Sequence, residues 1–141
     1  MVEVTLLIDD KELHFASQLN DLYQISVMHH FVDFADRITE ISITKDYIIV
    51  VTLPRDCKTN DNINAYDWDG NHLWNIGDIV GDIKIPFCGG QVVTAKQLNE
   101  PNCLESIDEV PSVLYSCVAG GFLFIIDPIQ KRVIKKIAGM R

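Results

Sequence analysis

Apolar and polar residues alternate along most of the chain. Residues 2–17 form two alternating stretches on either side of the polar pair Asp10-Lys11, which is typical of a β-hairpin. Residues 38–44 alternate in the same way, and the pair Lys45-Asp46 predicts a turn after them. The continuous apolar and β-branched run at 47–53 is typical of a strand covered on both faces. These patterns predict antiparallel strands joined by short turns.

Turn residues divide the rest of the chain in the same manner. The pair Asp69-Gly70 separates residues 63–67 from residues 72–76, and two pairs of adjacent glycines occur further along. Adjacent glycines supply the positive φ values that two-residue hairpin loops require. We therefore expect hairpin turns at Asp69-Gly70, Gly89-Gly90 and Gly120-Gly121.

Residues 18–36 fit two different patterns. Five apolar residues recur there at helical spacing: Leu22, Ile25, Met28, Val32 and Ala35. Tyr23, Ile25 and Val27 alternate instead as a strand would. We expect a short helix in this segment, with a strand as the alternative.

The length of the chain fits one domain. A chain of 141 residues buries roughly two thirds of the surface that its unfolded form exposes. Many short strands with frequent turns predict a mainly β fold built of antiparallel meander sheets. We expect one domain over residues 1–141, with an N-terminal hairpin and helix or strand in 1–36 and two further units in 38–76 and 84–137.

Two segments of the chain resemble each other. Residues 63–76 contain Ala-Tyr-Asp-Trp-Asp-Gly-Asn-His-Leu-Trp, and residues 122–137 contain Ile-Asp-Pro-Ile-Gln-Lys-Arg-Val-Ile. Each segment ends a strand on an aspartate, turns through polar residues and begins another strand, although the second lacks the turn glycine and the closing tryptophan. This pattern resembles the last two strands of a β-propeller blade of the quinoprotein-like repeat class.

The resemblance implies that residues 38–76 and 84–137 are two blade-like units. A closed propeller needs about 4 to 8 blades, so two units cannot close a ring within one chain. Uncovered sheet edges and apolar faces would then remain, and a homo-oligomer is the simplest cover for them. The family mostly scaffolds interactions, so the resemblance implies an architecture and carries no cofactor or activity to this chain.

Charge is distributed unevenly along the chain. The net charge is −8, yet all 20 acidic residues lie at or before Asp127. The charged residues within 131–141 are all basic. Phosphate binding relies on clustered Lys and Arg, so the acidic bulk argues against a nucleic-acid partner. We expect the basic end to be a short strand that pairs with an acidic neighbour.

The ends and the cysteines indicate a compartment. The N-terminus shows no basic stretch that leads into an apolar one, and no uncharged apolar run approaches the roughly 20 residues of a membrane helix. Four cysteines are dispersed without a C-x-x-C pair: Cys57, Cys88, Cys103 and Cys117. Dispersed thiols fit a reducing compartment, so we expect a cytoplasmic protein without a membrane partner.

The segment around the paired histidines contains the candidate metal ligands. These are His29, His30, Asp33 and Asp36. On a helix, His29 and Asp33 would share a face and could hold a metal or pair a base with its orienting carboxylate. A metal or catalytic site needs at least three converging groups, and no further ligand is indicated. We therefore expect no cofactor and no enzyme activity, with a metal-dependent hydrolase as the alternative.

An acidic loop contains the candidate binding residues. Residues 99–112 hold two prolines, no base and four acids: Glu100, Glu105, Asp108 and Glu109. Long loops in compact domains are where binding residues collect, and an exposed Trp68 at a turn would be an anchor for a partner. We expect a non-catalytic protein-interaction module that binds a protein, such as a basic one, through acidic loops and self-associates. An acidic inhibitor or immunity-type protein that masks a basic nuclease is the alternative.

Overall fold

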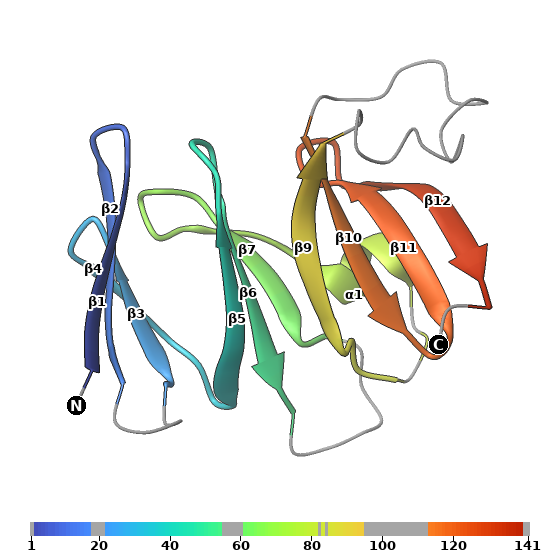
Figure 1. Ribbon diagram of the computed structural model, residues 1–141, viewed down its shortest axis with the longest axis horizontal. Helices are drawn as coiled ribbons and strands as arrows, with labels where there is room; N and C mark the ends of the chain where they lie inside the picture. Colours follow the sequence, from blue (N-terminus) through green and yellow to red (C-terminus); the bar gives the residue numbers. More distant parts are fainter. Residues whose placement is uncertain are drawn as a thin grey trace.

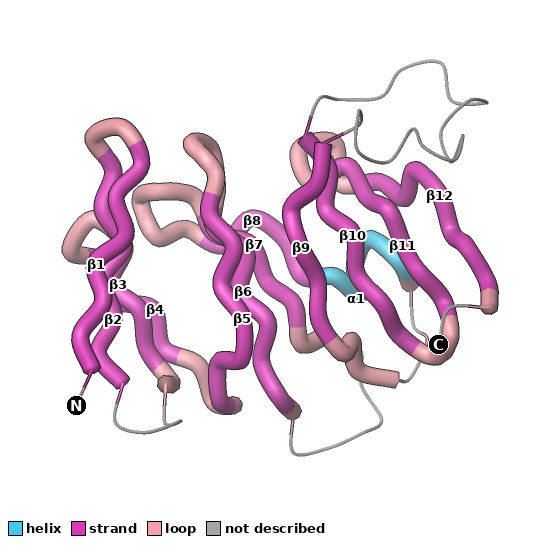
Figure 2. Tube along the Cα trace, viewed as in Figure 1, coloured by secondary structure: helices cyan, strands magenta, loops and turns pink. Residues whose placement is uncertain are grey.

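The described part of the chain is built almost entirely of β-strands. The computed structural model describes residues 2–17, 22–54, 61–81, 83, 85–94 and 113–139. These residues form twelve strands and one short helix (Figures 1 and 2). The strands make three four-stranded antiparallel sheets, each a meander in chain order. The predicted fold class, mainly β with antiparallel meander sheets, is confirmed.

The N-terminal segment forms a complete sheet, which we call the first sheet. Its strands are β1 (Val2–Ile8), β2 (Lys11–Ser17), β3 (Gln24–Val27) and β4 (His30–Asp33). The predicted β1–β2 hairpin is present, and its turn lies at Asp9-Asp10, one residue before the expected position.

The short helix expected near residues 18–36 is wrong for the described part of that range. Residues 22–36 contain β3 and β4, and Met28 and His29 turn the chain between them with φ values of 49° and 70°. The strand pattern prevails because β3 pairs with β2 and directs Ile25 and Val27 into an apolar core, where they are 1% and 0% exposed. The deciding interactions come from another strand, so the local helical spacing does not set the structure.

The other two sheets follow in order along the chain. The second sheet contains β5 (Arg37–Ile43), β6 (Ile48–Leu53), β7 (Ile63–Tyr66) and β8 (His72–Asn75). The third sheet contains β9 (Gly89–Thr94), β10 (Val113–Ala119), β11 (Phe122–Asp127) and β12 (Arg132–Ala138). Between them lies α1 (Ile76–Val80), whose N-terminus is capped by the side chain of Asn75. None of the helices in the described ranges is long and apolar enough to cross a membrane.

Three of the four predicted turns are confirmed. The chain reverses at Lys45-Asp46 between β5 and β6, at Asp69-Gly70 between β7 and β8, and at Gly120-Gly121 between β10 and β11. Both hairpins that follow β7 and β11 turn on an aspartate, since Asp67 Oδ1 and Asp127 Oδ1 each accept two backbone N–H groups of their own turn. The two segments that resemble each other in sequence are therefore equivalent hairpins of the second and third sheets.

The turn predicted at Gly89-Gly90 is wrong, because both glycines lie within β9. A Cβ atom at Gly90 would lie only 2.2 Å from the Tyr115 hydroxyl oxygen, and one at Gly89 would lie 2.7 Å from Glu40 Oε2. Glycine is needed here because a tyrosine side chain and a carboxylate approach the backbone closely. The two glycines serve packing between elements, and no chain reversal occurs at them.

The strand β6 is covered on both faces, as its apolar run predicts. Ile48 and Val50 pack with residues of the first sheet, while Ile49 and Val51 pack with residues of the third sheet; all four are at most 2% exposed. The three sheets are thus stacked face to face with the second sheet in the middle (Figure 1).

Two apolar clusters fill the spaces between the sheets. The first seam lies between the first and second sheets, and its buried residues are Leu13, Ile25, Val27, Ile38, Ile48, Val50 and Trp68. The second seam lies between the second and third sheets, and the most buried of its large residues include Ile49, Ile63, Ile76, Tyr115 and Ile126. A third cluster, Val93, Leu114 and Ile125, belongs to the opposite face of the third sheet, since these residues alternate with those of the second seam.

Buried polar groups fasten the second seam. Trp74 Nε1 on β8 donates to the backbone oxygen of Pro128 in the β11–β12 turn at 2.9 Å. Asn62, 2% exposed, donates through Nδ2 to the backbone oxygens of Thr52 and Phe87, and its Oδ1 accepts from the Phe87 N–H, all at 2.9 Å. These bonds fix the position of the third sheet against the second.

The second seam generates a prediction with a matched control. Trp74→Phe removes the N–H that satisfies the Pro128 oxygen, together with some packing, and we expect the free energy of unfolding to fall by roughly 1–3 kcal/mol. Tyr115→Phe should leave that free energy unchanged or raise it by about 1 kcal/mol, because the buried Tyr115 hydroxyl has no hydrogen-bond partner in the described part of the structure. Denaturant unfolding measures both changes, and equal losses in the two variants would contradict this description of the seam.

Candidate interaction surface

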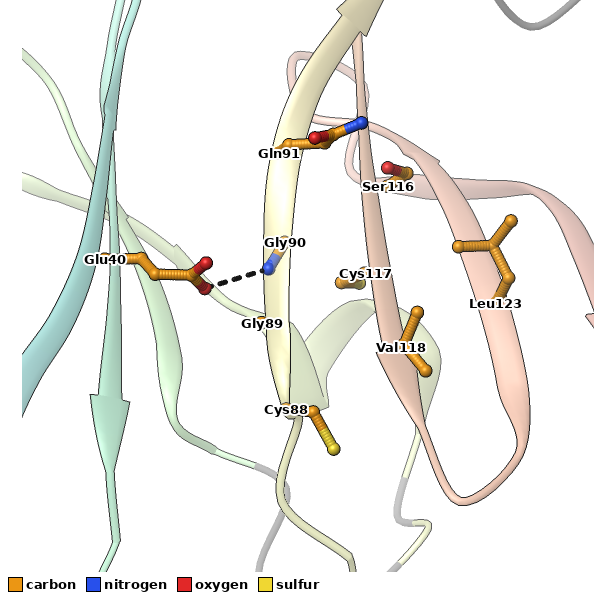
Figure 3. A pocket seen from close by; sticks show the side chains of 9 residues that line it. All are labelled: Glu40, Cys88, Gly89, Gly90, Gln91, Ser116, Cys117, Val118 and Leu123. Carbon is orange, nitrogen blue, oxygen red and sulfur yellow. Dashed lines mark hydrogen bonds between the residues drawn. The ribbon is translucent and has the colours of Figure 1, made fainter. Parts of the chain in front are cut away.

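A hollow of about 380 Å³ lies where β9 runs beside β5 (Figure 3). Its lining residues are Glu40, Cys88, Gly89, Gly90, Gln91, Ser116, Cys117, Val118 and Leu123. Glu40 is exposed and also lines a second hollow of about 300 Å³ between the first and second sheets. The two hollows therefore meet at one carboxylate.

Glu40 links the edges of two sheets. The register between β5 and β6 shifts between Ile38 and Glu40, so Thr39 is an extra residue in β5, and its hydroxyl donates to the backbone oxygen of Val51 at 3.2 Å. Such a bulge re-aims the following side chain. Glu40 Oε2 accepts the N–H of Gly90 at the edge of β9, at 3.1 Å. The carboxylate satisfies a backbone group at a strand edge, which is a structural role.

The hollow beside β9 lacks the arrangement of a nucleophilic site. Burial raises the pKa of the Cys117 thiol to about 12, so the reactive thiolate is disfavoured at neutral pH. Figure 3 places Glu40 on one side of β9 and Ser116 on the other, so Glu40, the one carboxylate among the described lining residues, does not lie beside this hydroxyl. The lining residues include no histidine, lysine or arginine. We therefore assign no catalytic role to this hollow.

The candidate metal ligands do not converge. His29 lies in the turn between β3 and β4, His30 lies beside Gly70 of the second sheet, and Asp33 accepts a hydrogen bond from Gln24 Nε2 at 2.6 Å. The expected approach of His29 to Asp33 required a helix; instead His29 lies in the turn before β4 and Asp33 lies at the far end of this strand. The described residues hold no group of three or more His, Cys, Asp or Glu side chains that could bind a metal ion, and Asp36 is part of none.

Of the predicted binding residues, Trp68 lies in the described part of the structure and the acidic loop does not. Trp68 is only 7% exposed, packs in the first seam and donates from Nε1 to the backbone oxygen of Thr44 at 2.9 Å. In this conformation Trp68 is therefore not exposed, and it cannot anchor a partner as expected. The four acids of the predicted binding loop lie outside the described residues: Glu100, Glu105, Asp108 and Glu109.

The outer face of the first sheet presents two large apolar side chains. Leu7 on β1 and Phe31 on β4 are each 70% exposed. Strand alternation places them opposite the apolar residues of the first seam, on the face that no other described sheet covers (Figure 1). This face lies at one end of the stack. Leu7 and Phe31 lie on the two edge strands of this sheet, with β2 and β3 between them. Exposed apolar side chains with polar neighbours make this face a candidate interaction site.

Acidic residues surround these two side chains. Alternation places Glu3, Glu12 and Asp33 on the same face as Leu7 and Phe31. More carboxylates flank the sheet at its turns and its end: Asp9, Asp10 and Asp36. Lys11, whose Nζ lies 3.6 Å from Asp10 Oδ1, is the one Lys or Arg in the described part of the first sheet, and His14 lies on the same face as Leu7. We call this face, with Leu7, Phe31, Glu3, Glu12 and Asp33, the acidic face.

Sequence reasoning missed the two apolar side chains of the acidic face. The signal is present for Leu7, because Leu6-Leu7-Ile8 interrupts the alternation of β1 and one of the three residues must point away from the core. The exposure of Phe31 was not predicted because a helix was expected in this segment, and the face of a sheet on which Phe31 lies is then not defined. Which face is uncovered depends on the order of the sheets and cannot be read from the strands alone.

Comparison with known proteins finds no match: no family model, curated protein or solved structure is similar to this chain. The geometry of the described residues therefore carries the functional argument by itself.

The burial of Cys117 generates a prediction about thiol chemistry. Iodoacetamide applied to the folded protein near pH 8 should alkylate the exposed Cys88 and leave Cys117 unmodified. A pKa raised from 9.0 to about 12 lowers the thiolate fraction by about a thousandfold, and burial blocks access as well. Peptide mapping by mass spectrometry reads both sites, and unfolding in guanidinium is the positive control for Cys117. Rapid alkylation of Cys117 in the folded protein would contradict the interpretation of this side chain as an inert core thiol.

Proposed function

We propose that the chain is a non-catalytic protein-interaction module that binds through the acidic face of its first sheet. The observation that carries the proposal is the pair Leu7 and Phe31, each 70% exposed on a sheet face at the end of the stack. Fully burying one such side chain is worth roughly 1.5–3 kcal/mol, so covering both contributes substantially to binding.

The carboxylates around this pair favour a basic partner. Rim charges speed encounter and select partners more than they add to affinity. A basic protein surface would meet Glu3, Glu12 and Asp33 around the apolar pair, and the acidic loop with Glu100, Glu105, Asp108 and Glu109 remains a second candidate for the same kind of partner. A basic nuclease masked by an acidic inhibitor is one partner of this kind.

An interaction role fits the chemistry of the described residues better than a hydrolase does. The His29 segment forms a strand whose potential ligands diverge, and Glu40 is occupied by a backbone N–H at a sheet edge. We place the protein in the cytoplasm, because the described cysteines Cys88 and Cys117 are free thiols.

The test compares a variant of the acidic face with a matched surface control. Leu7→Ser combined with Phe31→Ser removes both exposed apolar side chains, and Leu53→Ser removes a side chain that is 54% exposed at the end of β6 in the middle sheet. We expect the double variant to weaken binding of a partner at least tenfold and the Leu53 variant to bind like the wild type.

Affinity capture identifies the partner, and titration of the purified pair measures its Kd. Thermal unfolding shows whether the variants keep the fold, which we expect because all three side chains are exposed. Undiminished binding by a folded Leu7→Ser, Phe31→Ser variant would refute the proposed function.

A further inference from the structure

A histidine lies between the two exposed apolar side chains of the acidic face. The register places one residue of each strand in a single row across this face: Thr5, His14, Ser26 and Phe31. Leu7 pairs with Glu12, two residues before His14 in β2, so Leu7 is a diagonal neighbour of the histidine. Ser26, which separates His14 from Phe31 in the row, is small and only 8% exposed.

A partner that covers both apolar side chains also covers this histidine. Leu7 and Phe31 lie on the edge strands β1 and β4, with β2 and β3 between them. Neighbouring strands lie about 4.8 Å apart, so the two edge strands are roughly 14 Å apart. His14 lies within that span and on the same face, so the charge of its imidazole would lie inside the interface.

The other charged side chains of this face are all acidic. They come from three of the four strands: Glu3 on β1, Glu12 on β2 and Asp33 on β4. In β3, alternation places Gln24 and Ser26 on this face, and neither is charged. Lys11 alternates with Glu12 and therefore belongs to the opposite face. Histidine is the side-chain type that ordinarily changes charge between about pH 5 and 8, and one added positive charge would offset one of these three carboxylates.

The hydrogen bond of His14 permits both charge states. Its Nδ1 lies 3.0 Å from Thr5 Oγ1. A hydroxyl group can donate to a neutral imidazole nitrogen or accept from a protonated one, so this pair persists when the ring gains a proton. Nε2 has no hydrogen-bond partner among the described residues. Protonation is therefore tolerated by the fold, and its effect falls on whatever covers the face.

We infer that His14 is a partner contact that makes binding at the acidic face depend on pH. This inference rests on the proposed function and adds the regulation of the same site. With His14 neutral, a basic partner meets only carboxylates and apolar groups. With His14 protonated, the partner brings like charges together over the centre of the face, which disfavours the complex. Binding is therefore strong above the pH at which His14 gains its proton and weak below it.

A synthetic basic peptide tests this dependence on the full chain. The probe alternates lysine and leucine over about nine residues, is capped at both ends and spans roughly 30 Å when extended. Its lysines ordinarily titrate near pH 10, so the charge of the peptide is the same at about pH 7.5 and about pH 5.5. Titration calorimetry at equal ionic strength should give a Kd about tenfold higher at the lower pH.

Three single variants assign the effect to one side chain. His14→Gln stays neutral and keeps polar atoms for Thr5, so its Kd should be the same at both pH values. His14→Lys is charged throughout and should bind weakly at both. His29→Asn is the matched control, because His29 is an exposed histidine of the same sheet and asparagine tolerates its φ of 70°. This control should keep the pH dependence of the wild type.

The contradicting results are specific. A wild-type Kd that is equal at the two pH values, or a His14→Gln variant that keeps the full pH effect, overturns the inference. Circular dichroism should show the same strands at both pH values. Loss of the strands in the wild type at the lower pH also overturns it, since the fold would then respond to pH.

Failure of the inference can be separated from failure of the proposed function. If the Leu7→Ser, Phe31→Ser variant loses the peptide while wild-type binding is indifferent to pH, only the role of His14 is overturned. If this variant is folded and binds the peptide as tightly as the wild type, the use of the acidic face itself is overturned. A peptide that does not bind the wild type at about pH 7.5 contradicts both.

Discussion

Burial of β6 on both faces is the constraint on which the rest of the structure depends. Its side chains alternate between two apolar clusters, with Ile48 and Val50 in the first seam and Ile49 and Val51 in the second. Exposing either set would cost roughly 1.5–3 kcal/mol for each side chain. The second sheet therefore requires a neighbour on each face, and the first and third sheets take these places. Within the described ranges, the same arrangement leaves one face of the first sheet, at the end of the stack, without such a neighbour.

Few polar contacts are needed once the sheets are stacked, and they lie where the sheets join. Trp74 reaches the β11–β12 turn, Asn62 holds the segment at Phe87, and Glu40 satisfies the N–H of Gly90 at the edge of β9. Each of these groups satisfies a backbone atom that a sheet junction leaves without a partner. This is why the hollow beside β9, although it contains a carboxylate, a hydroxyl and a thiol, is a structural junction. Function is then expected at the ends of the stack.

Features that depend on neighbouring residues could be predicted from the sequence, whereas features that depend on contacts between distant residues could not. The apolar run of β6 and the turn at Gly120-Gly121 were predicted, since burial and positive φ leave a direct mark on composition. The turn at Lys45-Asp46 was predicted because a polar pair separates two apolar stretches. The helix expected near residues 18–36 is wrong over the described residues 22–36, because pairing of β3 with β2 overrides helical spacing. The turn predicted at Gly89-Gly90 is wrong because these glycines are required by the close approach of Tyr115 and Glu40, which are remote in sequence. The acidic face was missed for the same reason, because exposure depends on the order of the sheets.

The central claim is that the middle sheet is covered on both faces within one chain, which leaves the acidic face at the end of the stack to bind a partner. Hydrogen exchange followed by mass spectrometry, on the protein alone and with a captured partner, tests both parts in one measurement. Exchange of β6 should be slow in both samples, and exchange of β1 and β4 should become slower only when the partner is bound. Exchange at β6 as fast as at β1, or exchange at β1 and β4 that the partner leaves unchanged, would contradict the claim.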